Sequence, residues 1–278
     1  MNPWDEVHAD QTSRIARDTP HQATILIVAG LDPSGGAGLL ADARVVGQHG
    51  FHAAGVVTAL TEQDSTQCAW MHPVPAEVVS NQLARLIDDF EIRGVKIGVL
   101  ATAEVALAVA KALRRLVDGN VPIVMDPILR ATRGVPLLEG TPAHALQPVL
   151  ELATLVTPNL DELAALTGRH VASLDEMREA AQRLRSSYSG PRAVLAKGGH
   201  LHGDPIDLLV DADGDVSWKG HRVEGPTPHG TGCALSSEIA CQLAIGTPLR
   251  DAVQSATERV RVRIAEARAV GRGRPFLG

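Results

Sequence analysis

Short, continuously apolar runs rich in β-branched residues recur along the chain, and stretches with helical periodicity lie between them. The apolar runs cover 24–29, 54–60, 95–100, 122–125, 155–157 and 192–196. The helical stretches cover 38–48, 76–90, 103–117, 160–166 and 174–186. Strands that are apolar along their whole length are buried on both faces, as in a parallel sheet covered by helices. The alternation therefore predicts an α/β fold with a largely parallel central sheet.

The pattern changes in the last third of the chain. Two further strands and two helices are expected there, at 206–210, 216–220, 232–245 and 248–267. An Asp-Gly step between the two strands indicates a β-hairpin. No linker rich in Pro, Gly or Ser divides the chain. We therefore predict a flexible polar tail over 1–22 and a single domain over 23–278.

Charge and cysteine content argue against several classes of protein. Lys and Arg total 26 against 32 Asp and Glu, a formal net charge of -6, which does not suit a nucleic-acid-binding surface. No apolar run reaches the roughly 18 residues of a membrane helix, and residues 1–23 hold no apolar signal segment. The three cysteines include no Cys-x-x-Cys pair, so neither a disulfide framework nor a cysteine-based zinc site is expected. We predict a cytoplasmic protein without nucleic-acid or membrane partners.

A glycine-rich loop, residues 30–38, joins the first apolar run to the first helix. Glycines let a ligand approach the backbone, and a helix N-terminus attracts anions. A P-loop is rejected because Gly36 stands where its lysine is required. Gly36, Gly38 and Ala41 match a dinucleotide-binding fingerprint, although the turn is longer than that motif usually has. An ordinary strand-to-helix turn remains the third interpretation.

A second glycine loop, residues 229–233, opens a later helix and also presents backbone N–H groups at a helix N-terminus. Two such loops indicate two ligands, and a phosphoryl donor with its acceptor would need that arrangement. The positive end of the helix dipole would lower the pKa of the Cys233 thiol. Alternatively, Cys233 is a small buried hydrophobic residue, as most unpaired cysteines are.

Polar residues also follow three of the later apolar runs. Asp126 and Lys197 each lie at the end of such a run, and Lys197 can pair with phosphate or with a carboxylate. Asn159 and Glu162 are three residues apart and share the first turn of a helix. Their oxygens suit Mg²⁺ bound mostly through water. The same spacing forms a capping box, which spacing alone favours.

Seven motifs occur in order along most of the chain. They are AGLDPSGGAGLLAD (29–42), VVTALTEQDS (56–65), KIGVL (96–100), MDPIL (125–129), TPNLDELAALTG (157–168), LAKGGH (195–200) and HGTGCALSS (229–237). In this combination the chain resembles the hydroxymethylpyrimidine and phosphomethylpyrimidine kinases of thiamin biosynthesis, in the ribokinase-like superfamily. The resemblance implies a three-layer α/β/α sandwich with a mainly parallel central sheet. It also implies phosphoryl transfer from ATP to the pyrimidine hydroxymethyl group or to its monophosphate.

The resemblance implies roles for individual residues. The pyrimidine pocket would be formed by Gly30, Ala37, Asp42, Gln63, Val99 and Ile128. ATP and the transferring phosphoryl group would contact Asp126, Asn159, Lys197, Gly230, Thr231 and Gly232. Cys233 would act as the catalytic base. Asn159 and Glu162 would bind Mg²⁺ and phosphate, a role that a capping box allows. A homodimer is implied as well.

The chain departs from the family pattern in three places. Thr132 and Arg133 replace the usual Lys and Ser in a stretch expected to form a flap over the site, where Arg133 can restore the positive charge. Residues 62–64 read Glu-Gln-Asp in place of Ala-Gln-Asn, and Val99 replaces Met. These changes leave open whether both phosphorylations are retained. We expect the monophosphate to be a substrate.

Three alternatives remain at this point. A pyridoxal kinase of the same superfamily would share the phosphate-binding loop and differ only in the acceptor pocket. A Rossmann NAD-dependent enzyme would bind its cofactor at 36–41. A regulator built on the kinase scaffold would bind the pyrimidine without turnover, although the loop at 230–233 is intact.

Overall fold

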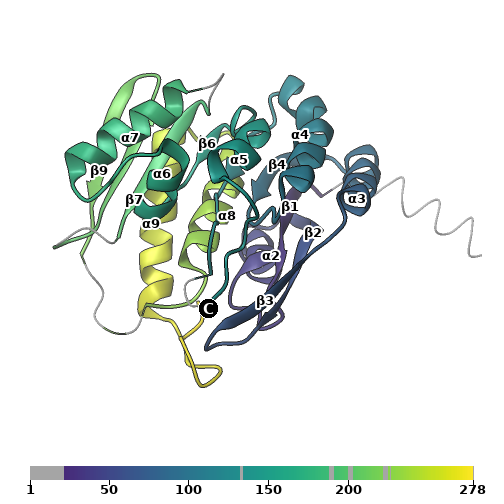
Figure 1. Cartoon of the computed structure of the whole chain (residues 1–278), viewed down its shortest axis with the longest axis horizontal. Coiled ribbons are helices and arrows are strands. Elements are labelled where there is room, and N and C mark those ends of the chain that lie inside the picture. Colours follow the sequence, from purple (N-terminus) through teal and green to yellow (C-terminus); the bar gives the residue numbers. More distant parts are fainter. Residues whose placement is uncertain are drawn as a thin grey trace, which may run out of the picture.

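The computed structural model describes residues 22–277, except for 132–133, 188–190, 200–202, 222–224 and 226. The predicted tail up to residue 21 therefore lies outside the described residues. The described residues form a nine-stranded sheet of order β3-β2-β1-β4-β5-β6-β7-β8-β9 (Figure 1). The strands are β1 Thr24–Leu31, β2 His52–Gln63, β3 Cys68–Pro73, β4 Ile92–Ile97, β5 Ile123–Met125, β6 Leu155–Val156, β7 Ala193–Gly198, β8 Ile206–Asp211 and β9 Gly214–Lys219.

Neighbouring strands β2, β1, β4, β5, β6 and β7 run parallel, so their carboxyl ends share one edge of the sheet. β3 pairs antiparallel with β2 at one end of the sheet. At the other end, β8 pairs antiparallel with β7, and β9 returns as the predicted hairpin. The prediction of a mainly parallel sheet is confirmed.

Helices cover both faces of this sheet. They are α2 Gly38–Gln48, α3 Ala76–Asp89, α4 Ala103–Asp118, α5 Pro142–Leu150, α6 Leu160–Thr167, α7 Leu174–Ser186, α8 Thr231–Ala244 and α9 Leu249–Ala265. Helices α3 to α7 pack on one face, and α2, α8 and α9 pack on the other (Figure 1). The three-layer α/β/α sandwich is therefore confirmed. In the described part of the chain, none of the helices has both the length and the apolarity that a membrane crossing requires.

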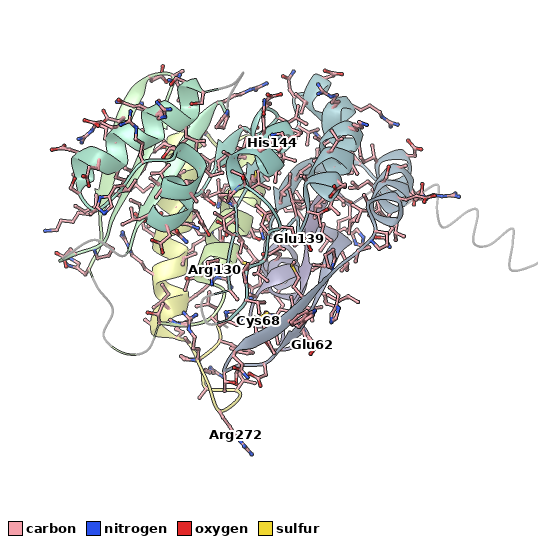
Figure 2. All side chains as sticks on the ribbon, in the orientation of Figure 1. Glu62, Cys68, Arg130, Glu139, His144 and Arg272 are labelled. Carbon is pink, nitrogen blue, oxygen red and sulfur yellow. The ribbon has the colours of Figure 1, made fainter. Side chains whose placement is uncertain are left out.

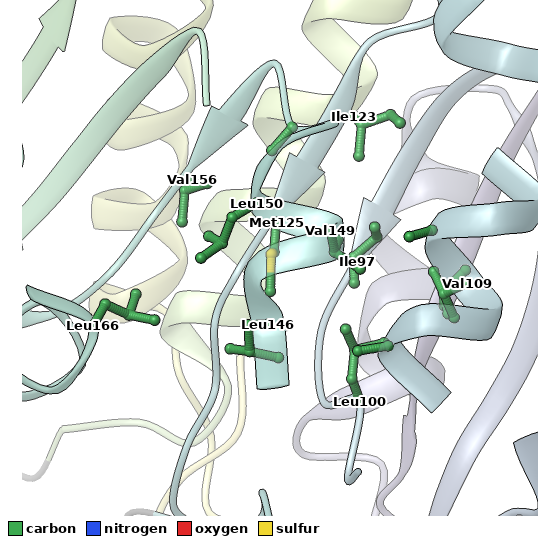
Figure 3. Packing of buried hydrophobic residues seen from close by; sticks show 14 of the residues in the cluster. Ile97, Leu100, Val109, Ile123, Met125, Leu146, Val149, Leu150, Val156 and Leu166 are labelled. Carbon is green, nitrogen blue, oxygen red and sulfur yellow. The ribbon is translucent and has the colours of Figure 1, made fainter. Parts of the chain in front are cut away.

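The core is aliphatic because aromatic residues make up only 3% of the chain. Figure 3 shows the packing under α4 and α5, where Ile97, Met125 and Val149 belong to one buried cluster. All three side chains are fully excluded from solvent. Burial of a side chain of this size contributes about 1.5–3 kcal/mol. The cluster therefore anchors β4 and β5, whose carboxyl ends lead into the loops of the candidate site.

Two elements were not predicted, and each lacks the usual signal. β3 is an edge strand with mostly exposed side chains, Trp70 among them, so it has no continuous apolar run. Helix α5 begins at Pro142, which suits a first turn, but it also contains Pro148, and an internal proline normally kinks or ends a helix. Only the first part of the apolar run 95–100 lies in the sheet. Its strand ends at Ile97, which frees Val99 to enter the loops at the edge of the sheet.

Candidate active site

A cavity of about 520 Å³ opens at the edge where the carboxyl ends of the parallel strands meet. Ligands of open α/β sheets bind at this edge. The predicted site residues in the cavity wall are Gly30, Ala37, Gln63, Val99, Asp126, Ile128, Asn159, Glu162, Lys197, Gly230, Thr231, Gly232 and Cys233. The expected flap residues Thr132 and Arg133 lie outside the described residues. The topology thus gathers residues from all seven motifs around one space.

The first glycine loop closes around the Asp32 carboxylate. Asp32 accepts hydrogen bonds from the Ser34 backbone N–H at 2.9 Å, the Ser34 hydroxyl at 2.7 Å and the Ala37 backbone N–H at 3.0 Å. Gly38 has a φ of 59°, and a Cβ there would lie 2.4 Å from the Gly30 carbonyl oxygen. Only glycine fits this position. The tight loop brings Gly30 and Ala37 into the cavity wall.

Asp32, Gln63 and His229 meet inside the cavity from three distant segments. Gln63 Nε2 lies 3.1 Å from Asp32 Oδ2 and 2.7 Å from His229 Nε2. Burial by itself would raise the pKa of Asp32, but hydrogen bonds from His229 and Ser34 outweigh it and the net shift is downward. An ionised carboxylate only accepts hydrogen bonds, so Gln63 must turn its amide nitrogen toward Asp32. Its carbonyl oxygen is then available to a ligand that donates a hydrogen bond.

The second glycine loop packs directly on the first. Gly230 has a φ of 81° and is the N-cap of α8. A Cβ at Gly230 would lie 2.1 Å from the Gly36 carbonyl oxygen, so the two backbones touch. Thr231 and Gly232 follow in the first turn of α8, where backbone N–H groups lack partners within the helix and the dipole is positive. The two predicted anion-binding loops therefore border one shared cavity.

Lys197 and Asp126 form an ion pair beside the second glycine loop. Lys197 Nζ lies 2.7 Å from Asp126 Oδ1, which also accepts a hydrogen bond from the Thr157 hydroxyl at 3.0 Å. Burial by itself would lower the pKa of Lys197, but the Asp126 and Glu162 carboxylates outweigh it and the net shift is upward. Lys197 therefore stays cationic. A Cβ at Gly232 would lie 3.2 Å from Lys197 Nζ, so the missing side chain leaves the ammonium open toward the loop.

Asn159 and Glu162 form the capping box of α6. The Glu162 backbone N–H donates to Asn159 Oδ1 at 2.9 Å, and the Asn159 backbone N–H donates to Glu162 Oε2 at 2.8 Å. Burial raises the pKa of Glu162 to about 7, against the attraction of Lys197. Both residues also line the cavity. Helix capping and contact with a ligand are thus compatible at this position.

The charge balance here suits a cation bound through water. Asp126 and Glu162 are two buried carboxylates that both interact with the Lys197 ammonium, and Asp126 also interacts with Lys96. Across the described residues, no three His, Cys, Asp or Glu side chains are grouped to hold a metal ion directly. Mg²⁺ commonly keeps several waters and uses one or two carboxylates plus substrate phosphates. The residues present fit that mode of binding and do not form an all-protein cage.

Cys233 lies in the first turn of α8 and lines the cavity, yet only 5% of it is exposed. Burial raises the pKa of its thiol to about 11, although the nearby Lys96 ammonium opposes the shift. The lowering expected from the helix dipole is therefore wrong, because removal from water has the larger effect. Near pH 7 the ligand-free protein holds Cys233 as a neutral thiol.

Asp42 does not line the cavity, in contrast to the expectation that it contacts the pyrimidine. Its carboxylate is fully buried, with Oδ2 at 2.5 Å from Lys96 Nζ and Oδ1 accepting from the Ser237 hydroxyl at 2.9 Å. Because both of its carboxylate oxygens are bound by these partners, Asp42 stabilises the cavity wall from behind. The sequence does hold a signal for this pair, because a lysine within an apolar strand needs a buried partner. His229 and Lys96 were not singled out as site residues, although both lie in quoted motifs.

The chain is similar to known proteins over nearly its whole length. The family described as phosphomethylpyrimidine kinase matches residues 32–276. A hydroxymethylpyrimidine/phosphomethylpyrimidine kinase of Rhizobium meliloti is 40% identical over 256 residues, which cover 91% of this chain and 95% of that protein.

Two solved structures share the fold. The phosphomethylpyrimidine kinase of Clostridium difficile matches with a TM-score of 0.72 at 29% identity, covering 87% of this chain and 98% of that one. The pyridoxal kinase of Bacillus subtilis, solved as an ADP complex, matches with a TM-score of 0.81 at 26% identity, covering 92% of this chain and 96% of that one. The ribokinase-like fold expected from the motifs is confirmed.

Proposed function

The chain belongs to the phosphomethylpyrimidine kinase family, and on that premise we propose that it transfers the terminal phosphoryl group of ATP to hydroxymethylpyrimidine phosphate in thiamin biosynthesis. Free hydroxymethylpyrimidine is the second acceptor. The observation that carries the proposal is the backbone contact between Gly36 and Gly230. It joins the first glycine loop (residues 30–38), on the acceptor side, to the phosphate loop (residues 230–233) in one cavity. Direct transfer requires donor and acceptor in line within a single site.

The acceptor half of the cavity has one polar edge and an apolar wall. Val99 and Ile128 offer apolar surface to a planar ring, and the backbone at Gly30 lets the ring approach closely. Asp32 accepts from the Gln63 amide nitrogen at 3.1 Å, which turns the Gln63 carbonyl oxygen away from it. That oxygen lies 3.4 Å from the Thr61 hydroxyl and has a second lone pair that can accept from a ligand. An exocyclic amino group on a pyrimidine is the matching donor. This edge therefore supports an aminopyrimidine as the acceptor substrate.

The phosphate half supplies positive charge without a covalent intermediate. During transfer an acceptor oxygen bonds to the terminal phosphorus while the bond from phosphorus to the bridging oxygen breaks, and ADP leaves with that electron pair. The backbone N–H groups of residues 230–232 and the Lys197 ammonium stabilise the negative charge on the transferring group. Phosphoryl transfer depends mainly on such positioning and electrostatics.

The two acceptors differ in their need for a base. An ionised phosphate oxygen attacks without losing a proton, because the second pKa of a phosphate monoester is about 6. The free alcohol must lose its proton, and we assign Cys233 as the group that accepts it. Since burial raises the pKa of Cys233 to about 11, the thiol must first release its own proton to water in the cavity, and the resulting thiolate then accepts the proton of the alcohol. The monophosphate is therefore the better acceptor.

Mg²⁺ bound with ATP would neutralise phosphate charge. Asn159 and Glu162 would hold it through water, since both line the cavity and Glu162 shares the Lys197 ammonium with Asp126. Asp126 keeps Lys197 in place beside them at 2.7 Å. We also propose a single domain over 23–278, a homodimer and a cytoplasmic location, which stay predictions.

Pyridoxal phosphorylation is the second candidate, and the TM-score of 0.81 with a pyridoxal kinase favours it. Such an enzyme would keep the phosphate half and change the acceptor edge. Membership in the kinase family leaves the NAD-dependent alternative without support.

The test is ADP release under steady state with ATP and Mg²⁺, on hydroxymethylpyrimidine, its monophosphate and pyridoxal in parallel. Turnover on the monophosphate with the higher kcat/KM is expected. Lys197→Met should abolish turnover. Lys219→Met replaces a lysine on the exposed surface of β9 and should keep the wild-type turnover. Turnover on pyridoxal alone would reassign the acceptor, and absence of turnover on all three would reject the kinase activity.

A further inference from the structure

The chain after α9 runs back to the cavity and does not end as a loose tail. Residues 268–277, which we name the C-terminal strap, lie beside the tip of the β2–β3 hairpin (Figure 1, yellow). The strap is closed at its base, because the Arg268 N–H donates to the Phe276 carbonyl at 3.0 Å and the Phe276 N–H donates to the Arg268 carbonyl at 2.8 Å. Its glycines and arginines had no role in the sequence analysis.

One side of the C-terminal strap holds the loop that follows Gln63. The Arg274 backbone N–H donates to the Ser65 carbonyl at 3.0 Å, and the Gly273 N–H donates to the Ser65 hydroxyl at 3.1 Å. A Cβ at Gly273 would lie 2.0 Å from the Ser65 carbonyl oxygen, and a Cβ at Gly271 would lie 2.3 Å from Ser65 Oγ. The approach of the strap to this loop thus requires both glycines.

The other side of the strap holds the segment that leads into the phosphate loop. The Arg274 guanidinium donates from Nε to the Thr227 carbonyl at 2.8 Å and from Nη2 to the Pro228 carbonyl at 2.7 Å. The His229 N–H donates to the Pro275 carbonyl at 2.8 Å. A planar guanidinium bound to two successive carbonyls fixes the orientation of both peptide planes. The next residue, Gly230, starts the phosphate loop.

Phe276 connects these contacts to the first glycine loop. Its ring is nearly buried and lies 5.9 Å from the His229 ring, measured between centroids. A Cβ at Gly36 would lie 2.9 Å from the Phe276 ring, so the ring also packs on that loop. His229 in turn reaches Gln63 at 2.7 Å. Arg274 and Phe276 therefore contact both the residues that support the acceptor edge and the segment that leads into the phosphate loop.

We propose that the C-terminal strap couples the loop after Gln63 (residues 64–67) to the phosphate loop (residues 230–233), with Arg274 as the positioning residue that holds both in register. The Arg274 guanidinium holds the backbone of 227–228, and the Arg274 backbone N–H holds the Ser65 carbonyl. Arg274 also lines the cavity, and the role assigned to it here is to position these two segments. The proposal rests on the proposed function only for the identity of the acceptor, because the nucleotide side is tested separately.

The chain offers a closely matched control. Arg272 lies two residues from Arg274 in the same strap, is exposed, and makes no hydrogen bond or ion pair with another residue in the described part of the chain. Figure 2 shows it at the tip of the strap, pointing away from the molecule. Arg274→Ala, Arg274→Lys and Arg272→Ala are compared with the wild type as full-length proteins. The readouts are amide hydrogen exchange at 64–67 and 227–231, the Kd for ADP, and kcat and KM for the acceptor.

R274A removes the guanidinium bonds to 227–228 and keeps the backbone N–H that bonds Ser65. If the strap couples the two loops, its release from 227–228 should also loosen its contact with Ser65, so exchange should rise in both loops. ADP binding should weaken by about tenfold, the size of one lost charge-assisted hydrogen bond. R274K should recover part of both effects, because an ammonium can reach one carbonyl but not two. R272A should match the wild type in every readout.

Three results would overturn the proposal. Exchange in R274A that rises in only one loop, or in neither, removes the coupling. An ADP affinity equal to that of R272A removes the positioning role. Loss of activity in R274A that follows its melting temperature and disappears on cooling shows general destabilisation alone. A wild type that binds ADP but phosphorylates no pyrimidine would instead reject the proposed function, while exchange and ADP affinity would still decide the role of the strap.

Discussion

The Lys96 ammonium and the Asp42 carboxylate lie 2.5 Å apart, and both side chains are fully buried. Lys96 comes from β4 and Asp42 from α2, and Ser237 of α8 donates to the second Asp42 oxygen at 2.9 Å. The pair therefore joins three elements directly behind the cavity wall. Lys96 also opposes the effect of burial on the Cys233 thiol.

Replacement of Lys96 by Met should leave the Asp42 carboxylate buried without its cation. Burial already raises the pKa of Asp42 while Lys96 opposes the shift, so the variant should shift it further upward. We expect K96M to lower the free energy of unfolding by about 3–5 kcal/mol, as for other buried pairs that lose one partner. Lys111→Met, on the exposed face of α4, should stay within about 0.5 kcal/mol. Urea denaturation measures both, and equal losses would contradict the structural role of the pair.

Replacement of Glu162 by Gln should change how stability depends on pH. Burial raises the pKa of Glu162 from 4.5 to about 7. Between these values the folded carboxyl holds a proton that the unfolded chain releases, so the wild type loses stability as pH rises. E162Q keeps the cap geometry but has no such proton. From pH 5 to pH 8, E162Q should therefore gain up to about 3 kcal/mol relative to the wild type.

Glu176 provides the control for this measurement. It has the same capping-box position on α7 with Ser173, but its side chain is 44% exposed. Hydrogen bonds from the Ala172 and Ser173 backbone lower the pKa of Glu176, so its contribution is present above 4.5 and is lost only at lower pH. E176Q should show no change relative to the wild type between pH 5 and pH 8. Equal pH profiles for E162Q and E176Q would show that Glu162 does not titrate as the structure indicates.

Replacement of Gly232 by Ala should impair transfer more than folding. The added Cβ would lie 3.1 Å from Asp126 Oδ2 and 3.2 Å from Lys197 Nζ, in the space assigned to phosphate. We expect kcat to fall by about tenfold or more, because displacement of a charge-stabilising group costs at least that much. Gly47→Ala on α2 meets nothing within 4 Å and should stabilise the helix by about 1 kcal/mol with unchanged kcat. A wild-type kcat for G232A would place the phosphate elsewhere.

Replacement of Cys233 by Ala should separate the two acceptors. Only the free alcohol needs a group to accept its proton, so kcat on hydroxymethylpyrimidine should fall by about 10²-fold, the scale of general base catalysis. The kcat on the monophosphate should stay at the wild-type value, because its attacking oxygen is already ionised. Both rates come from the same ADP-release assay. Equal losses on the two acceptors would indicate that Cys233 serves the phosphate loop and is not a base.

Much of the architecture could be predicted because its signals are local. The limits of α2 and α7 match the predicted stretches 38–48 and 174–186, since glycine, caps and apolar periodicity all lie within those segments. Strand β3 escaped prediction because its stability comes from pairing with β2 and not from burial of its own side chains. Helix α5 was not predicted because Pro148 interrupts its helical pattern.

The candidate site was harder to predict from the sequence because its contacts join residues that are far apart in the chain. Asp32 and His229 are 197 residues apart, and their contact with Gln63 exists only once the two glycine loops touch. Asp42 carries a family motif position, yet the structure shows its partners to be Lys96 and Ser237. The pKa of Cys233 likewise depends on how deeply α8 packs, which a dipole argument from sequence does not include.

The most direct test is a competition between acceptors. Equimolar isotopically labelled hydroxymethylpyrimidine, unlabelled monophosphate and pyridoxal are incubated with the enzyme and limiting ATP with Mg²⁺, and the products are quantified by mass spectrometry. The structure predicts the pyrimidine diphosphate as the main product, pyrimidine monophosphate formed from the alcohol as the second, and little pyridoxal phosphate. Pyridoxal phosphate as the main product would contradict the assignment of the acceptor edge formed by Asp32, Gln63 and His229.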